Sequence, residues 1–131
     1  MIVADTNLAA YLLLGGPGTR LAREVFIRDP QWAAPFLWRS EFRSVLAQYL
    51  RKQELSLSDA LVIQRKAESL FQGREYLLRS QHVLQLVSQS TCSAYDCEFV
   101  ALATQLGAKV VTMDAKLLRA FPRHAIALTT G

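Results

Sequence analysis

The chain has 131 residues, of which 51% are hydrophobic and 20% are charged. This length and composition fit one globular domain and exclude a disordered chain, which would be poorer in apolar side chains. The net charge is +4, with 15 basic and 11 acidic residues, which suits a polyanionic partner but also fits an ordinary soluble surface.

No segment has the length or layout of a membrane or export signal. The apolar stretch from Leu8 to Leu14 is far shorter than the roughly 20 residues that cross a bilayer. Asp5 lies where a signal peptide would be basic, so we expect a cytoplasmic location with no membrane contact. Cys92 and Cys97 belong to no CxxC or Cys/His cluster, which favours buried free thiols over a disulfide scaffold or a zinc site.

Apolar spacing and the positions of glycine and proline predict strands that alternate with helices. The predicted strands cover residues 1–4, 32–34, 76–78, 109–112 and 125–128. The predicted helices cover residues 8–14, 19–27, 36–52, 82–89 and 116–121, with one more from a cap at Ser56 or Ser58 to about Phe71 and one from Ser93 to Gly107. Pro35 is predicted to open the helix over 36–52.

This alternation indicates an α/β fold, with a parallel sheet that helices cover on both faces. No linker or internal repeat interrupts it, so we expect residues 1–131 to form a single domain.

Four carboxylates fall where such a sheet would form a site. Asp5 and Asp114 each follow a predicted strand closely, and sites in open parallel sheets form beyond the carboxyl ends of the strands. Glu41 and Asp96 lie in the early turns of helices, at the end where the chain arrives from the sheet. Because clustered carboxylates repel one another, this set favours a hard divalent cation such as Mg²⁺ or Mn²⁺, which prefers oxygen ligands.

Each acid also has a purely structural explanation. Asp5 and Asp114 could cap helices, and Asp96 lies three residues after Ser93, as in a capping box. Capping does not explain Glu41, which lies in an apolar stretch. The chemistry of a metal site therefore explains the set better than capping does.

No Ser/His/Asp triad or catalytic Cys/His pair is evident. His82 and His124 are far from the acidic segments in the sequence, so we expect neither to be catalytic.

The acids occur in four segments whose order and spacing have a known counterpart. They are IVADTN at residues 2–7, SEF at 40–42, SAYDCEFVALA at 93–103 and VVTMD at 110–114. Together they resemble the PIN-domain family, and more narrowly its VapC-type toxins, over essentially the whole chain. The opening Asp-Thr-Asn is a weak signal alone, whereas Tyr95-Asp96 followed after Gly107 by Val-Thr-x-Asp114 is much more specific.

The resemblance implies a three-layer α/β/α domain with a central parallel sheet and an Mg²⁺- or Mn²⁺-dependent endoribonuclease activity. It assigns Asp5, Glu41, Asp96 and Asp114 as the acidic quartet, with Asp5 and Asp96 most directly tied to metal. Glu41 and Asp114 would complete the coordination or act through water.

The resemblance also implies supporting residues and partners. Thr6 and Thr112 match positions that orient the carboxylates, although local backbone capping explains them equally well. A cognate antitoxin would cover the acidic site, and family members usually form homodimers. Basic residues near the acids could hold the RNA backbone, although a solvent-facing role explains each at least as well. They are Arg39, Arg43, Lys116 and Arg119.

Other functions fit the residues less well. A receiver-type signalling domain needs paired acids after the first strand, where only Asp5 is present. A haloacid-dehalogenase-like phosphatase needs an Asp where this chain has Asn7. Two alternatives stay open: a PIN fold that binds RNA or protein without turnover, and a nuclease of RNA maturation that is not a toxin.

Overall fold

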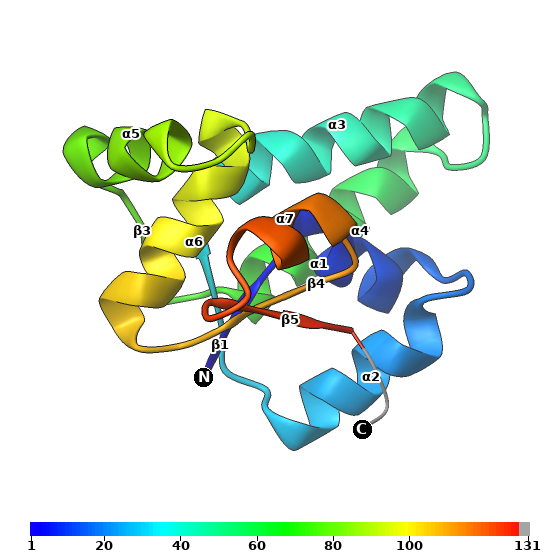
Figure 1. Cartoon of the computed structure of the whole chain (residues 1–131). Coiled ribbons are helices and arrows are strands. Elements are labelled where there is room, and N and C mark those ends of the chain that lie inside the picture. Colours follow the sequence, from blue (N-terminus) through cyan, green and yellow to red (C-terminus); the bar gives the residue numbers. More distant parts are fainter. Residues whose placement is uncertain (129–131) are drawn as a thin grey trace.

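A five-stranded parallel sheet forms the centre of the molecule (Figure 1). The computed structural model describes residues 1–128. The strands are β1 (Ile2–Ala4), β2 (Trp32–Pro35), β3 (Glu75–Tyr76), β4 (Val110–Thr112) and β5 (Ala125–Ala127). Their spatial order is β3-β2-β1-β4-β5, and every neighbouring pair is parallel. The carboxyl ends of β1 and β4 therefore meet at one edge of the sheet.

Helices flank the sheet and complete the predicted three-layer α/β/α fold (Figure 1). They are α1 (Thr6–Leu14), α2 (Thr19–Arg28), α3 (Leu37–Arg51), α4 (Leu57–Leu70), α5 (Ser80–Ser88), α6 (Ala94–Leu106) and α7 (Ala115–Ala120). Within residues 1–128, no helix is both long enough and apolar enough to span a membrane.

Local sequence signals explain most of the helix ends. Ser56 caps α4, since its hydroxyl accepts a hydrogen bond from the Asp59 backbone N–H at 3.0 Å. Ser93 caps α6 in the same way. Gly107 ends α6 with a φ of +64°, a left-handed conformation that glycine adopts without steric cost. Cys92 and Cys97 are buried free thiols, as expected.

The prediction that Pro35 opens a helix is wrong. Pro35 is the last residue of β2, and α3 begins two residues later. The paired register of β1 and β2 runs from Ile2↔Trp32 to Val3↔Ala33, so the missing N–H of Pro35 costs no hydrogen bond of that ladder. Smaller differences affect the segment 75–80, where the strand ends at Tyr76 and α5 already begins at Ser80.

Helix α3 is anchored to the sheet by aromatic packing. Trp38 is fully buried, and its ring lies 4.5 Å from that of Phe71 and 5.9 Å from that of Phe42, measured between centroids. Such aromatic pairs stabilise a core beyond the burial of their area. They fix the depth at which the first turns of α3 lie against the sheet.

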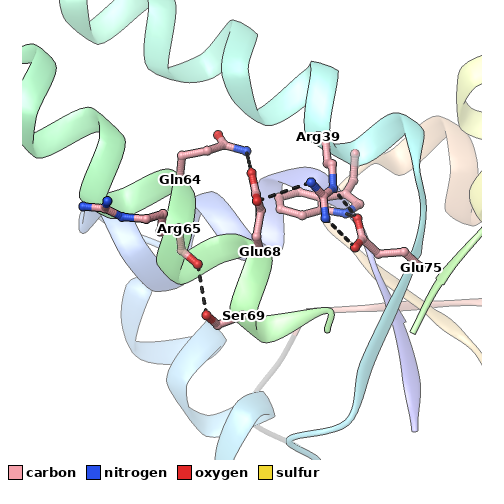
Figure 2. Close-up of polar contacts among 7 residues, drawn as sticks. Arg39, Gln64, Arg65, Glu68, Ser69 and Glu75 are labelled. Carbon is pink, nitrogen blue, oxygen red and sulfur yellow. Dashed lines mark hydrogen bonds and ion pairs between the residues drawn. The ribbon is translucent and has the colours of Figure 1, made fainter. Parts of the chain in front are cut away.

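An ion-pair network beside Trp38 ties α3 to the edge strand β3 (Figure 2). Arg39 donates to both oxygens of Glu75, with Nε–Oε2 at 2.6 Å and Nη2–Oε1 at 2.8 Å. The Trp38 indole Nε1 also donates to Glu75 Oε2, at 2.7 Å. The hydrogen bond from Arg39 lowers the pKa of Glu75 below its usual value, although partial burial opposes this.

This lowered pKa predicts how stability depends on pH in the variant Glu75→Gln. Because Glu75 is more acidic in the folded state, the stabilisation from its charge is fully present above the unfolded-state pKa of about 4.3. It is lost as the pH falls through the lower folded-state pKa. We expect the melting temperature of Glu75→Gln to lie below that of the wild type at neutral pH, and the gap to narrow below about pH 4.

Thermal melts between acidic and neutral pH test this. The exposed Glu54, in the turn between α3 and α4, provides the control variant Glu54→Gln, for which we expect a small gap at every pH. A gap for Glu75→Gln that does not change with pH would contradict the prediction.

Candidate active site

The four acids singled out in the sequence line one cavity of about 310 Å³. Asp5 lies between β1 and α1, and Asp114 lies between β4 and α7. Glu41 projects from the second turn of α3, and Asp96 from the first turn of α6. The parallel sheet thus brings together residues that are up to 109 positions apart in the chain, as the strand-end argument predicted.

Two buried threonines hold two of the carboxylates. The Thr112 hydroxyl donates to Asp5 Oδ2 at 2.6 Å, and the Thr6 hydroxyl donates to Glu41 Oε1 at 2.7 Å. Thr6 and Thr112 are 5% and 2% exposed, and they are the buried polar residues among residues 1–128. Burying a hydroxyl is costly unless it is hydrogen-bonded, so these bonds restrict where the carboxylates can lie.

The sequence left open whether these threonines orient carboxylates or cap local backbone. The bond from Thr6 spans 35 residues and is not a local cap. Thr112 does both, because its hydroxyl also accepts from the Asp114 backbone N–H at 3.0 Å.

The capping explanation of the acids holds for two of them. Asp5 caps α1 by accepting from the Asn7 N–H at 2.9 Å, and Asp114 caps α7 by accepting from the Lys116 N–H at 2.9 Å. For Asp96 the Ser93 half of the predicted capping box is present, since the Ser93 hydroxyl accepts from the Asp96 N–H at 3.0 Å, but the cap is Ser93 and not the Asp96 carboxylate. Glu41 is half-buried and is neither a cap nor an ordinary surface residue.

Burial and mutual repulsion raise the pKa of three of the acids. For Asp5 burial is the largest cause, and the charges of Asp96 and Asp114 add to it against the hydrogen bond from Thr112. Burial also raises the pKa of Glu41 and of Asp96, with further increases from neighbouring carboxylates. The ionised forms destabilise one another here, and a bound cation would relieve that cost.

The donor set has the chemistry of a divalent-cation site, because it consists of carboxylate oxygens beside hydroxyl and amide groups. Over residues 1–128, however, no three His, Cys, Asp or Glu side chains form a preassembled group that could hold a metal ion. Mg²⁺ is usually bound through one or two carboxylates and keeps several waters, so the set fits such an ion without a closed cage of protein ligands.

The structure adds residues that the sequence interpretation missed. Ser44 and Gln48 line the cavity from α3, three and seven positions after Glu41, a spacing that places them on the same helix face. Glu98 on α6 is half-buried, its pKa is raised by burial, and its charge raises that of Glu41. Its position between buried Cys97 and Phe99 was a signal of the kind that drew attention to Glu41.

The basic residues near the acids differ in their surroundings. Arg39 is engaged with Glu75 and Glu68, which favours a structural role over the RNA contact that was considered for it. Arg43, Lys116 and Arg119 are exposed. The positive charge of Lys116 partly opposes the rise in the pKa of Asp96. His82 and His124 do not line the acidic cavity.

Several solved structures share this fold at low sequence identity. PAE2754 from Pyrobaculum aerophilum gives a TM-score of 0.76 at 19% identity, covering 97% of this chain and 90% of that chain. A toxin–antitoxin complex from Klebsiella pneumoniae gives 0.73 at 18% identity, covering 98% of each chain. FitAcB from Neisseria gonorrhoeae gives 0.75 at 19% identity, covering 99% of this chain and 98% of that chain. At these identities the likeness establishes the fold alone.

The sequence itself has a match at the level of a family. No curated protein matches the chain. The model of the PIN domain family matches residues 2–122, which include all four acids of the cavity. Since this match extends over most of its length, the chain belongs to the PIN domain family.

Proposed function

We propose that this protein is an Mg²⁺- or Mn²⁺-dependent endoribonuclease of VapC type, the toxin of a type II toxin–antitoxin pair. PIN domains are generally nucleases that use divalent metals, so membership of the family supports hydrolysis of nucleic acid. The observation that carries the proposal is the convergence of Asp5, Glu41, Asp96 and Asp114 on one cavity.

The arrangement of the carboxylates suits this chemistry. A bound divalent cation would lower the pKa of a water molecule and neutralise charge on the phosphodiester. Asp5 and Asp96 are the proposed direct ligands, and Glu41 and Asp114 complete the coordination or act through water. Thr6 keeps Glu41 from rotating freely, so part of the ordering cost is met before any cation binds.

Hydrolysis adds water across one P–O bond of the RNA backbone. The proposed products are a 5′-phosphate and a 3′-hydroxyl, so the water oxygen joins phosphorus as the bond to the 3′ oxygen breaks, and a proton passes to the leaving oxygen. Lys116 and Arg119 are exposed on α7, which follows Asp114 directly, and they are the proposed contacts for the flanking phosphates.

The toxin assignment brings two protein partners. The Klebsiella pneumoniae neighbour is a toxin–antitoxin complex, which supports a cognate antitoxin whose segment would cover the cavity. For the homodimer, α4 provides exposed apolar side chains at Leu57, Leu61 and Val62. Phe42 in α3 and Phe71 at the end of α4 are buried within the monomer, so they contribute nothing to such an interface.

The metal-dependent nuclease predicts that Asp5→Asn and Asp96→Asn each lose cleavage of a structured RNA in Mg²⁺ or Mn²⁺. Changing groups that only support metal ligands typically costs 10–100-fold, so we expect losses of at least about 100-fold here. Cleavage is measured with purified protein, free of antitoxin, with each cation and with EDTA. Asp59→Asn, at an exposed acid on α4, is the matched control and should cut at the wild-type rate.

Two outcomes separate the alternatives. Wild-type cleavage by a folded Asp5→Asn variant would exclude the metal assignment. Stoichiometric RNA binding without turnover under all conditions would instead indicate a binding module.

The phosphate contacts predict a change in the salt dependence of RNA binding. In a non-cleaving Asp96→Asn background, Lys116→Gln and Arg119→Gln should each weaken binding. Each should also reduce the slope of log K against log salt concentration by about 0.7 to 1, the contribution of one phosphate contact. Arg65→Gln on α4, which does not line the cavity, is the control. Unchanged slopes for both α7 variants would place the RNA elsewhere.

A further inference from the structure

Helix α3 carries Glu41 to the cavity, but its own N-terminus is weakly specified. Within the described chain, Phe36 at the N-cap position makes no side-chain capping bond, and the first turn of the helix contains no acidic residue. Phe36 is also the one residue between the end of β2 and the start of α3. The direction of the first turn therefore depends on contacts that its side chains make with other elements.

Two such contacts lie on opposite faces of α3. Glu41 accepts from Thr6 on one face, at 2.7 Å. Arg39, two positions earlier, forms its two-bond contact with Glu75. With 3.6 residues per turn, side chains two positions apart point in directions that differ by roughly 200°. The first turns of α3 are thus held between the cavity and the edge strand β3.

Among the ion pairs of residues 1–128, the pair of Arg39 with Glu75 has the carboxylate that is most shielded from solvent. The Glu75 side chain is 9% exposed, whereas the carboxylates of the other ion pairs found over residues 1–128, on Asp29, Glu24 and Glu68, are 31%, 37% and 32% exposed. Three N–H groups converge on Glu75, two from Arg39 and one from Trp38. Breaking a shielded, bidentate pair leaves one charge without its partner, which is costly, so the pair resists displacement.

The same guanidinium extends the contact to α4. Arg39 Nη1 lies 3.3 Å from Glu68 Oε1, and Gln64 donates to Glu68 Oε2 at 3.0 Å (Figure 2). On the strand side, β3 is only two residues long. The Ala34 N–H donates to the carbonyl of Arg74, just before β3, and the Phe36 N–H donates to that of Tyr76, the last residue of β3. Arg39 and Glu75 therefore join α3, α4 and β3 at the point where β2 turns into α3.

We propose that Arg39 and Glu75 are positioning residues that hold Glu41 where the acidic site needs it to bind a divalent cation. The inference rests on the proposed function, since it concerns the same site. Neither residue lines the cavity, so any effect on the site passes through the placement of α3. The proposal adds this polar contact, on the far side of the helix, to the packing of Trp38 that already anchors the first turns of α3.

The test is a titration of the purified full chain with Mn²⁺ alone. Electron paramagnetic resonance of the free ion measures how much Mn²⁺ is bound. The variants are Glu75→Gln, Arg39→Gln and the double variant, measured well below the melting temperature of the least stable one. Asp29→Asn is the matched control, because it removes the ion pair between Asp29 and the N-terminus without touching α3. Circular dichroism melts confirm that each protein is folded.

We expect both single variants to bind Mn²⁺ about tenfold more weakly, the lower end of the range for groups that orient metal ligands. The double variant should be no weaker than the singles, because two residues that act as one pair are non-additive. Asp29→Asn should lose stability but keep wild-type affinity. A loss of stability alone in Glu75→Gln, with unchanged Mn²⁺ affinity, would overturn the inference.

Failure of the inference and failure of the proposed function give different results. If the wild type binds no Mn²⁺, both are overturned. If the wild type binds Mn²⁺ and the folded variants bind it equally well, only the positioning role of Arg39 and Glu75 is overturned. Glu68→Gln, which removes the longer contact to the same guanidinium, should show a smaller loss in the same direction.

Discussion

Repulsion between carboxylates at one edge of the sheet is the constraint that the rest of the site depends on. The parallel pairing of β1 with β4 brings Asp5 and Asp114 together, and α6 adds Asp96. Burial is the largest cause that raises the pKa of Asp5, and the charges of Asp96 and Asp114 raise it further. A fold that tolerates such a cluster has to offset the cost in other elements, and the structure shows how it does so.

The offset comes from contacts that restrict the carboxylates without neutralising them. The buried Thr112 donates a hydrogen bond to Asp5, and the buried Thr6 donates one to Glu41. These hydrogen bonds favour the ionised forms of the two carboxylates. The Arg39–Glu75 pair lies outside the cavity. The positive charge of Arg39 is balanced by Glu75 on the edge strand β3 and not by the acids of the cavity. The hydrogen bonds from the two threonines oppose the rise in the pKa of Asp5 and Glu41 and restrict where the two carboxylates can lie.

Much of this arrangement could be predicted from local signals, and the errors have physical reasons. The strand ends before Asp5 and Asp114 identified the edge of the sheet, because period and turn residues are local properties. The contact between Arg39 and Glu75 could not be predicted, because the two residues are 36 positions apart and proximity to Glu41 in the sequence cannot reveal a contact on the opposite face of the helix. Pro35 was assigned to the start of a helix and not to the end of β2. A strand tolerates it there because the pairing of β2 with β1 already ends at Ala33, which the sequence does not reveal.

Helix capping by Asp5 and Asp114 does not compete with the metal binding that we propose for them. Each uses one carboxylate oxygen, Oδ1, to cap the helix that follows its strand. Asp5 meets Thr112 with its other oxygen. The cap fixes the carboxylate relative to the backbone at the strand end, which a side chain free to rotate could not achieve. The short connection from strand to helix thus positions these carboxylates at the cavity as a consequence of folding. This explains why residues that look like ordinary helix caps in the sequence are the ones that the sheet brings into the cavity.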